Sequence, residues 1–314
     1  MIVQPLAKTV LVRVEHLFRY YGSLCAVRDV SFQVQRGEVL GFLGRNGAGK
    51  STTLQMLAGC LAPSSGTIQI NGYDLLTEPR RAKSALGYLP EHPPLYREQT
   101  VDEYLRYCAE LRDVPKQRLA SALEETKVRC GITEVHKRFL GTLSKGYQQR
   151  VGIAQAILHA PPIVLLDEPT VGLDPVHRHA ILALIRELST EHAILLSTHT
   201  LSDVQAVCDR VQILDQGRLV ASDTLEGLVG LGQSTALVVG LRRPPPLERL
   251  GTLPGVLHIE RVEEGRFRLQ HAPEENPAER IVEEAVANGW GVYEICAERS
   301  SLEEIFVTMT QSPK

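Results

Sequence analysis

The chain has 314 residues, of which 43% are hydrophobic, and this is enough for one large or two ordinary domains with real cores. Its 34 Lys and Arg residues nearly balance 37 Asp and Glu residues, so the formal net charge of -3 argues against a protein that coats nucleic acid through bulk charge. The six cysteines are scattered without a C-x-x-C pair, which disfavours a zinc site or a disulfide framework and fits reduced cytosolic thiols.

The sequence lacks the two usual signals for insertion into a membrane. No uninterrupted apolar segment approaches the ~20 residues of a membrane-spanning helix. The N-terminal stretch M-I-V-Q-P-L-A-K-T-V lacks the apolar core of a signal peptide. The sequence therefore predicts a soluble protein, and it leaves docking on a membrane component open.

Two segments near the N-terminus alternate apolar and polar residues, which is the period of a half-buried strand. They are Leu11 to Leu17 and Ala26 to Gln35, and a turn at Arg19 to Gly22 is expected between them. Tyr21 lies in this turn, shortly before the glycine-rich motif that follows, and its ring is a candidate for stacking on a nucleotide base. Ordinary packing is the competing interpretation for this aromatic residue.

The stretch Val39 to Cys60, V-L-G-F-L-G-R-N-G-A-G-K-S-T-T-L-Q-M-L-A-G-C, reads as strand, glycine-rich loop and helix. This is the context that the phosphate-binding pattern G-x-x-x-x-G-K-[ST] requires. Glycines let the main chain wrap closely around triphosphate oxygens, and the helix points its positive end at the same place. A glycine turn that binds nothing is the competing interpretation.

Two side chains of this loop carry chemistry of their own. Lys50 adds a positive charge between the outer phosphates, and the hydroxyl of Ser51 is placed to bind Mg²⁺. The candidate nucleotide-binding residues of the loop are Gly44, Asn46, Gly47, Ala48, Gly49, Lys50, Ser51 and Thr52.

Short strands and turns follow. A strand is expected at Thr67 to Ile70, and Asn71-Gly72 after it is a hairpin signal. Leu86 to Leu89 is predicted to be another strand. The loop P-E-H-P-P-L-Y, which contains Glu91, cannot be helical because of its prolines.

From Val101 to Gly152 the pattern changes to helical spacing with many charges, which predicts a helical insertion between strands. Helices are expected at Val101 to Leu111 and at Gln117 to Val128. The block ends in L-S-K-G-Y-Q-Q-R, where Ser144 is a good N-cap for a helix with an apolar face. Taken alone, this is an ordinary capped helix.

Ile163 to Glu168 is an apolar strand that ends in two carboxylates, and parallel strands buried on both faces have this pattern. Acids at the C-terminal end of such a strand lie at the sheet edge where α/β proteins bind ligands. Asp167 can hold Mg²⁺ through water opposite Ser51, and Glu168 can polarise a water for attack on a γ-phosphate. A strand that stops at a polar turn is the competing interpretation, and it leaves the apolar run unexplained.

A tight loop from Pro169 to Pro175 leads into an expected helix at Val176 to Leu188. A further strand is expected at Ala193 to Leu196, and Ser-Thr-His follows it. A lone histidine is usually structural. His199, however, follows a strand end as Glu168 does, so one catalytic edge of the sheet can hold both.

The remainder of the chain differs in character. A hairpin at Arg210 to Leu214 and Arg218 to Ala221 comes first, and Arg242 to Pro246 looks like a rigid connector. A small α+β domain without a chemical motif is expected beyond it, with Trp290 in its core. Its expected strands are Val256 to Arg261, Arg266 to Leu269 and Gly291 to Ile295, and its expected helices are Ala278 to Asn288 and Leu302 to Thr308.

Five of these motifs occur in the order and rough spacing of ABC-type ATPases, and the chain resembles that family over about residues 10 to 230. In the family's terms they resemble the Walker A loop, the signature motif, the Walker B strand, the D-loop and the switch histidine, which are here Gly44 to Thr52, Leu143 to Gln148, Leu165 to Glu168, Leu173-Asp174 and His199. The phrases G-Y-L-P-E-H-P-P-L-Y and S-L-E-E-I-F-V are similar to the group of bacterial exporters that includes gliding-motility and multidrug ATPase subunits.

This resemblance implies a fold and a division into domains. The fold is an α/β P-loop NTPase of the ABC type, in which a parallel-sheet core carries an antiparallel β subdomain and a helical subdomain at about residues 91–160. The ATPase domain is expected at residues 1–232, and a C-terminal accessory α+β domain at residues 233–314.

It also implies a function. The chain is expected to bind and hydrolyse ATP with Mg²⁺ as the ATP-binding subunit of an exporter whose integral membrane permease is a separate chain. It is expected to be cytoplasmic, peripheral on the inner face of the cell membrane, and to close as a head-to-tail homodimer over two nucleotides. No nucleic-acid partner is expected.

Roles for individual residues follow from the same resemblance. Lys50, Glu168 and His199 form the expected catalytic set, and Ser51, Asp167 and Glu91 the expected metal set. Ser144 and Gly146 of one subunit are expected to touch the γ-phosphate bound by the other, and Asp174 and Tyr21 complete the nucleotide site, Tyr21 by stacking on adenine.

The sequence departs from the family's pattern in two places. The family usually has Gln where this chain has Glu91, a position that senses Mg²⁺ and contacts the permease; a carboxylate still ligates Mg²⁺. The signature usually reads L-S-G-G-Q, whereas here Lys145 adds a positive charge and Tyr147 replaces the polar Gln.

Two other functions compete with transport. A soluble ABC ATPase that acts on ribosomes or DNA is the main alternative; the single ATPase cassette and the absence of a long coiled coil between Lys50 and Asp167 argue against it. A regulatory module that binds ATP without hydrolysing it is disfavoured because both Glu168 and His199 are present.

Overall fold

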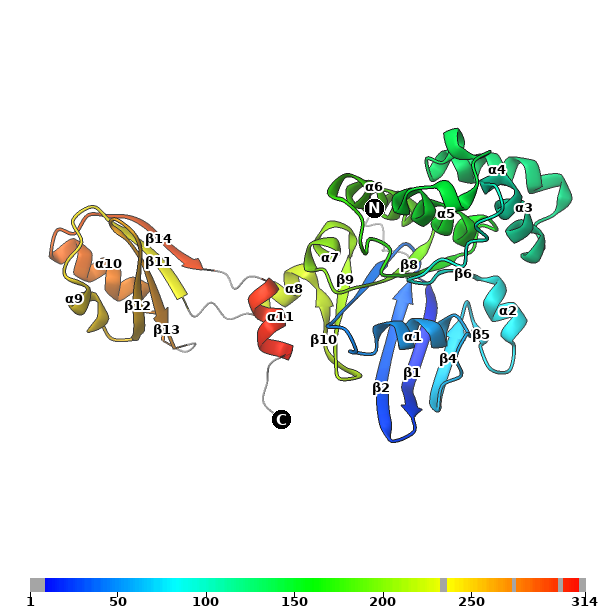
Figure 1. Cartoon of the computed structure of the whole chain (residues 1–314). Helices are drawn as coiled ribbons and strands as arrows, with labels where there is room; N and C mark the ends of the chain where they lie inside the picture. Colours follow the sequence, from blue (N-terminus) through cyan, green and yellow to red (C-terminus); the bar gives the residue numbers. More distant parts are fainter. Residues whose placement is uncertain (1–8, 232–235, 273–274, 299–301, 311–314) are drawn as a thin grey trace, which may run out of the picture. The chain divides into compact units, whose positions relative to one another are not determined.

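The computed structural model describes residues 9–231, 236–272, 275–298 and 302–310. The chain divides into two units, residues 1–225 and 226–314 (Figure 1). This division falls at helix α8 (Leu225–Leu231), close to the boundary at residues 232 and 233 that the sequence suggests. Of the helices in the described ranges, none is both long and apolar enough to span a membrane.

The centre of the first unit is a six-stranded sheet in the order β10-β9-β3-β8-β7-β6. Its strands are β3 (Val39–Leu43), β6 (Leu86–Leu89), β7 (Ile163–Asp167), β8 (Ala193–Thr198), β9 (Arg210–Asp215) and β10 (Arg218–Thr224). All neighbouring pairs are parallel except β9 and β10. Strands β3, β7 and β8 are buried along their whole length, which explains their continuous apolar sequences.

A second sheet of the first unit is antiparallel, in the order β2-β1-β4-β5. Its strands are β1 (Val10–Tyr21), β2 (Leu24–Gln35), β4 (Ser65–Ile70) and β5 (Tyr73–Asp74). The two sheets and helix α1 (Lys50–Leu57) share one apolar core, in which the rings of Phe32 and Phe42 meet edge to face at 5.1 Å. This core holds the segment before the glycine-rich loop and the helix after it in fixed positions.

The helical block lies between β6 and β7 in the chain, and Figure 1 shows its helices grouped together on one side of the central sheet. It contains α3 (Val101–Leu111), α4 (Lys116–Arg129), α5 (Lys145–Ile157) and the 3₁₀ turns η1 (Thr133–Val135) and η2 (Leu140–Thr142). Thr100 and Glu103 form a capping box at the start of α3, which explains its sharp beginning. The unit's other helices are α2 (Pro79–Ser84), α6 (Pro175–Leu188) and α7 (Leu201–Val207).

The second unit contains a four-stranded antiparallel sheet in the order β12-β13-β11-β14. Its elements are β11 (Ala236–Leu241), α9 (Leu247–Gly251), β12 (Val256–Glu263), β13 (Arg266–His271), α10 (Ala278–Ala287), β14 (Val292–Glu298) and α11 (Leu302–Thr310). From β11 to β14 this is the βαββαβ order of ferredoxin-like domains. Apolar residues of α9 and α10 pack with the sheet and with Trp290, which is 4% exposed, as its expected core role requires.

The α/β class, the parallel core, the antiparallel sheet and the helical block are confirmed, but two local expectations were wrong and one strand was missed. Strand β1 continues through the expected turn to Tyr21, which pairs with Leu24, so the turn is shorter. Strand β11 had no sequence signal, because a central strand buried on both faces shows no alternation. The Arg242–Pro246 stretch joins β11 to α9 within the second unit, and Arg242 and Arg243 donate backbone hydrogen bonds to Gly291 and Trp290.

Candidate functional site

The parallel register of the central sheet brings three chain segments to one edge. Leu43 at the end of β3 pairs with Thr198, and Asp167 at the end of β7 pairs with Ser197. The loops that follow these strands open onto a cavity of about 550 Å³. It is lined by Tyr21, Leu24, Ala26, Asn46, Gly47, Ala48, Gly49, Lys50, Ser51, Thr52, Glu91, Glu168, Val171 and His199.

Glycine is required at several points of the loop between β3 and α1. A Cβ atom on Gly44 would lie 2.5 Å from the carbonyl oxygen of Leu214, and one on Gly49 would lie 2.7 Å from that of Ala26. Gly47 and Gly49 also have positive φ values, 83° and 99°, which favour glycine. The loop therefore holds a tight conformation that bends its main chain around the cavity.

The N-terminus of α1 faces this cavity through Lys50, Ser51 and Thr52. Among the described residues, no side chain caps it, whereas Thr100, Ser144 and Asp174 cap α3, α5 and α6. The first N–H groups of a helix need partners from outside the helix, and the helix dipole makes anions favourable there. The arrangement suits a phosphate group.

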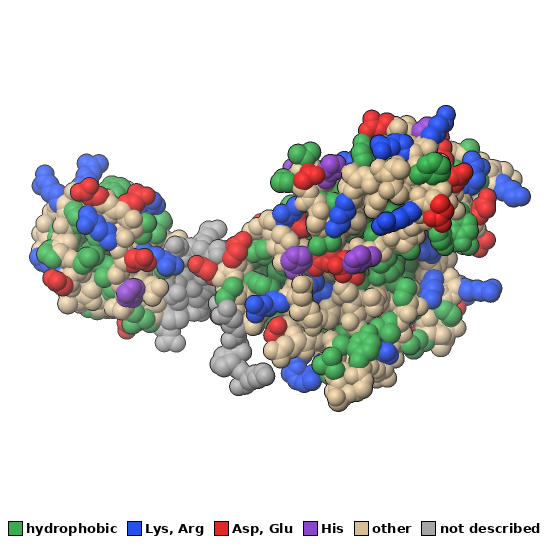
Figure 2. All heavy atoms as spheres, in the orientation of Figure 1, with side chains coloured by type: hydrophobic (Ala, Val, Ile, Leu, Met, Phe, Trp, Pro, Cys, Tyr) green, Lys and Arg blue, Asp and Glu red, His purple; other side chains and the backbone are tan. Residues whose placement is uncertain are grey.

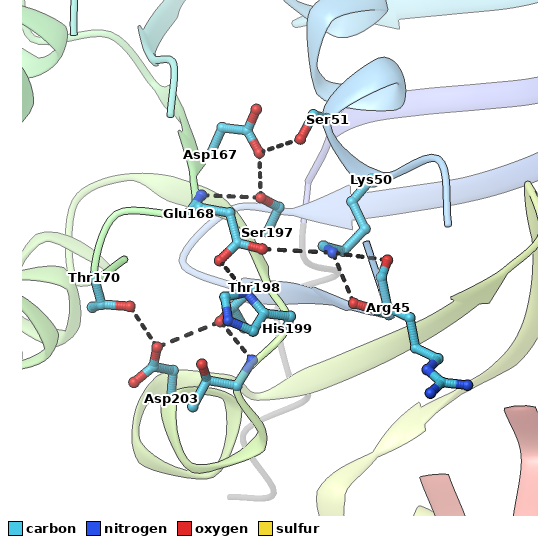
Figure 3. Close-up of polar contacts among 12 residues, drawn as sticks. Arg45, Lys50, Ser51, Asp167, Glu168, Thr170, Ser197, Thr198, His199 and Asp203 are labelled. Carbon is cyan, nitrogen blue, oxygen red and sulfur yellow. Dashed lines mark hydrogen bonds and ion pairs between the residues drawn. The ribbon is translucent and has the colours of Figure 1, made fainter. Parts of the chain in front are cut away.

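Lys50 is held beneath the loop with only 5% of its surface exposed. Its Nζ donates hydrogen bonds to the carbonyl oxygens of Gly44 at 2.7 Å and Arg45 at 3.3 Å (Figure 3). It also lies 3.5 Å from Oε1 of Glu168. The ammonium group is thus a preorganised positive charge at the floor of the cavity.

Asp167 is nearly fully buried and accepts two hydroxyl hydrogen bonds on Oδ1. Ser51 Oγ donates at 3.0 Å, and Ser197 Oγ donates to the same oxygen. Burial raises the pKa of Asp167, the carboxylates of Glu168 and Glu91 add to this rise, and the two hydroxyls oppose it. A bound cation would offset the cost of burying the negative charge of Asp167. A hydroxyl with nearby carboxylates also provides the hard oxygen ligands that Mg²⁺ prefers. The residues present therefore fit this metal.

Glu168 follows β7 directly and takes a left-handed conformation with φ 47°. Its backbone N–H donates to the carbonyl oxygen and to Oγ of Ser197, both at 3.1 Å. Its Oε2 lies 2.9 Å from Nδ1 of His199, which donates this hydrogen bond in the tautomer with its proton on Nδ1 (Figure 3). The carboxylate thus lies between an imidazole and an ammonium group at the cavity wall.

The remaining predicted site residues lie in other surroundings. Gly44 and Asp167 support the cavity through Lys50 and Ser51 without lining it. Three others, Ser144, Gly146 and Asp174, are likewise not among the lining residues. Ser144 caps α5, Asp174 caps α6 and bonds to His177, and a Cβ on Gly146 would lie 2.3 Å from the His177 ring.

Some functional residues had no sequence signal of their own. Leu24, Ala26 and Val171 line the cavity, and Ser197 bridges Asp167 and Glu168. The position of Ser197, two residues before His199 at a strand end, was the one available hint.

On the face drawn in Figure 2, acidic and basic side chains of the first unit are interspersed.

Known proteins share this sequence and this fold. The family described as "ABC transporter" matches residues 27–171. An uncharacterized ABC transporter ATP-binding protein of Bacillus subtilis, YxlF, is 38% identical over 232 residues, which cover 74% of this chain and 77% of that protein. The chain belongs to the ATP-binding proteins of ABC transporters. Members of this family bind and hydrolyse ATP, so the expected family and enzyme class are confirmed.

Two other members of the family match this chain in sequence, and a further one matches it in its solved structure. The linearmycin resistance ATP-binding protein LnrL of Bacillus subtilis is 31% identical and covers 96% of this chain and 98% of its own length. The bacitracin transport ATP-binding protein BcrA of Bacillus licheniformis is 36% identical over 67% of this chain and 68% of its own. A solved ATP-binding subunit of an ABC transporter has a TM-score of 0.65 at 36% identity, covering 70% of this chain and 92% of its own.

Proposed function

We propose that this chain is the ATP-hydrolysing subunit of a bacterial exporter. It binds ATP and Mg²⁺ in the cavity at the sheet edge, closes head-to-tail with a second copy, and drives a separate integral membrane permease from the cytoplasmic face of the membrane. The observation that supports this most is the Glu168 carboxylate, held between His199 and Lys50 beside the uncapped N-terminus of α1.

Nucleotide binding is assigned to the loop and the aromatic residue above it. Backbone N–H groups from Asn46 to Thr52 receive the phosphates, and Lys50 supplies the positive charge between them. Tyr21, which is 45% exposed and lines the same cavity, offers a ring on which adenine stacks. The cavity volume of about 550 Å³ is in the range of ordinary small-molecule sites.

Metal binding is assigned to Ser51, Asp167 and Glu91. Ser51 and Asp167 are already in contact, and the charge of Glu91 adds to the rise in the pKa of Asp167 that burial causes. When bound there, Mg²⁺ neutralises charge on the phosphate oxygens during transfer.

Hydrolysis is assigned to Glu168, with His199 and Lys50 as its partners. Glu168 accepts a proton from the attacking water on a carboxylate oxygen, because its contacts with His199 and Lys50 hold the carboxylate in a fixed orientation. His199 donates from Nδ1 to that carboxylate, which leaves the lone pair of Nε2 to accept a hydrogen bond from the attacking water. Lys50 stabilises the negative charge that develops on the phosphate oxygens.

A second copy of the chain is proposed to complete each site. Ser144, Gly146 and Asp174 carry the motifs that the family uses for nucleotide, yet in this chain they do not line the cavity. A head-to-tail pair accounts for this, because each copy then presents Ser144 and Gly146 to the other's γ-phosphate. Residues 1–232 are proposed to form this ATPase domain, with residues 233–314 as the accessory domain.

The membrane partner is proposed to dock on the helical block. A hollow of about 230 Å³ there is lined by Pro94, Tyr96, Tyr104, Tyr107, Cys108, Leu111, Arg112 and Gln155. Tyr96 and Tyr107 are 46% and 39% exposed, an apolar surface suited to a cytoplasmic loop of a permease. Export is favoured over import by the relatives whose names state linearmycin resistance and bacitracin transport.

ATP turnover of the purified full chain tests the enzymatic part. Wild type is expected to release phosphate slowly and only with Mg²⁺, and Glu168→Gln is expected to lower kcat by about 10²-fold or more while ATP still binds. Unchanged turnover in Glu168→Gln removes that residue from its role. A wild-type chain that binds ATP but does not hydrolyse it at any concentration supports a regulatory module instead.

A pull-down tests the transport part. Tagged Glu168→Gln chain with ATP is used as bait in gently solubilised native membranes, because it holds the closed pair. Recovery of a polytopic membrane protein supports the exporter assignment, and its identity leads to the substrate. Recovery of ribosomal or DNA-processing proteins supports a soluble ABC ATPase instead.

A further inference from the structure

The carboxylate of Asp203 on α7 is buried next to the catalytic edge without lining the cavity. It is 1% exposed. Thr170 Oγ1 donates to its Oδ2 at 2.6 Å (Figure 3). Arg178 Nε donates to its Oδ1, also at 2.6 Å. Both distances are short for such contacts, as expected when the acceptor is a charged carboxylate. The two donors come from the loop after β7 and from α6.

The same carboxylate reaches the loop after β8. Thr198 Oγ1 points at Oδ2 from 3.4 Å and accepts a hydrogen bond from the backbone N–H of Thr200 at 3.0 Å. His199 lies between these two threonines, so the turn that presents its imidazole is closed by Thr198. Arg178 adds a second link, because its Nη2 donates to Ser202 Oγ at 2.6 Å.

Glu168 and His199, the two proposed catalytic residues, therefore each lie close in sequence to a threonine whose hydroxyl contacts the buried carboxylate of Asp203. Thr170 is two residues after Glu168, and Thr198 is one residue before His199. Glu168 needs such support, because its φ of 47° is a strained conformation for a residue with a Cβ. Ser197 accepts a hydrogen bond from the backbone N–H of Glu168. Asp203 accepts one from the hydroxyl of Thr170, in the loop that follows Glu168.

Stability alone does not explain a buried carboxylate in this position. Taking a charge out of water costs several kcal/mol, and a buried ion pair seldom returns more than a well-packed apolar group would. Arg178 remains about one third exposed, so water still reaches this cation. A buried anion that links two loops of an active site is better explained by the geometry it imposes.

We propose that Asp203 is a positioning residue for ATP hydrolysis, which fixes the loop of Glu168 and the loop of His199 relative to each other through Thr170 and Thr198. It does not touch the nucleotide or the water. This inference rests on the proposed catalytic roles of Glu168 and His199. Its consequence is that the hydroxyl of Thr170 matters for turnover and not for nucleotide binding.

The test compares Thr170→Val with Thr170→Ser in the purified full chain. Valine has the shape of threonine without the hydroxyl, and it leaves Asp203 paired with Arg178. We expect Thr170→Val to lower kcat about tenfold with KM for ATP within about twofold, because small misplacements of catalytic groups are costly. Thr170→Ser keeps the donor and is expected to stay within about twofold of wild type.

Two further variants separate positioning from general destabilisation. Thr126→Val on α4 is the matched control, because Thr126 and Thr170 are both 6% exposed and Thr126 is not among the residues that line the cavity; its kcat is expected to equal that of wild type. Asp203→Asn keeps the side-chain shape, removes the charge, and is expected to lower kcat at unchanged KM as Thr170→Val does. Thermal midpoints are measured for all variants.

The double variant of Thr170→Val and Glu168→Gln distinguishes a positioning role of Asp203 from a purely structural one. Its turnover is compared with that of Glu168→Gln alone. If Asp203 acts through Glu168, the double variant turns over no more slowly than Glu168→Gln alone. An equal loss in both backgrounds, a wild-type kcat in Thr170→Val, or equal losses in the valine and serine variants each overturn the inference. Failure of the proposed function itself is distinct, because wild type and Glu168→Gln then have the same turnover.

Discussion

Nδ1 of His199 lies 2.9 Å from Oε2 of Glu168, although 31 positions separate the two residues in the chain. The parallel register of β7 and β8 accounts for this contact. Asp167 pairs with Ser197, and Glu168 donates its backbone N–H to Ser197, so the residues that follow each strand leave the sheet side by side. Two groups in such contact are expected to act as a unit in catalysis.

His199→Ala is expected to lower kcat by about 10²-fold, because Glu168 then loses the hydrogen bond that orients it. The double variant with Glu168→Gln is expected to be no slower than the slower single variant, as for groups that share one step. Steady-state phosphate release measures all three. His179→Ala, which changes an exposed histidine of α6, is the control and is expected to match wild type. Additive losses in the double variant contradict the shared role.

Tyr21→Ala is expected to raise KM for ATP about tenfold with little change in kcat, because one stacked base contributes roughly 1–3 kcal/mol. The guanidinium carbon of Arg19 lies 4.8 Å from the Tyr21 ring centroid and steadies its orientation. Tyr21→Trp is expected to keep KM near the wild-type value. The neighbouring Tyr20, with a similar exposure of 47% but outside the cavity lining, is the control as Tyr20→Ala. Equal KM values for the two alanine variants contradict base stacking.

Much of the site was predictable because parallel strands that are buried on both faces have recognisable sequences. The apolar runs before Gly44, Asp167 and Ser197 place their C-terminal ends at one sheet edge, and the contact of Glu168 with Lys50 and His199 follows from that topology. The residue types then specify the chemistry, since a glycine loop, a lysine and two acids serve phosphate and metal.

The supporting residues were not predictable by the same means. Asp203 receives its donors from segments 33 and 25 positions away, and no local pattern encodes such side-chain contacts. Strand β11 is central in its sheet, so its apolar run gave no alternation to distinguish it. The Arg242–Pro246 stretch resembles a linker in composition, yet its two arginines donate backbone hydrogen bonds inside the second unit. Tertiary context decides these cases.

Glu91→Gln is expected to weaken the binding of Mg²⁺ and so to raise the Mg²⁺ concentration that turnover requires. Glu91 lines the cavity, and burial raises the pKa of Asp167 with added contributions from the charges of Glu168 and Glu91, so Glu91 is close enough to act on the carboxylate that we propose binds the metal. Removing that charge lowers the attraction for a divalent cation. The Mg²⁺ concentration for half-maximal ATP turnover is expected to rise about fivefold, which corresponds to roughly 1 kcal/mol. Glu98→Gln, in the same loop but outside the cavity lining, is expected to have no effect. An unchanged Mg²⁺ requirement in Glu91→Gln removes Glu91 from the metal set.

His159 is expected to make the first unit less stable in mild acid. Burial lowers its pKa to about 4, the cation of Arg112 adds to this, and the hydrogen bond from Nε2 to the Leu86 carbonyl oxygen opposes it. Its buried Nδ1 has no partner among the described residues. An unfolded histidine takes up its proton near pH 6.5, whereas the folded one stays neutral until about pH 4, so stability is complete above pH 6.5 and falls between these values.

This loss amounts to roughly 2 kcal/mol in the free energy of unfolding between pH 7.5 and pH 5. His159→Gln keeps a donor for Leu86 and does not titrate, so its stability is expected to fall about 2 kcal/mol less over that range. Burial also lowers the pKa of His192, so a smaller loss of stability in acid remains in this variant. Urea unfolding followed by circular dichroism measures the effect, and fluorescence of the chain's one tryptophan, Trp290, reports the second unit separately. His179→Gln is the exposed control, and a pH dependence in His159→Gln equal to that of the control contradicts the assignment to His159.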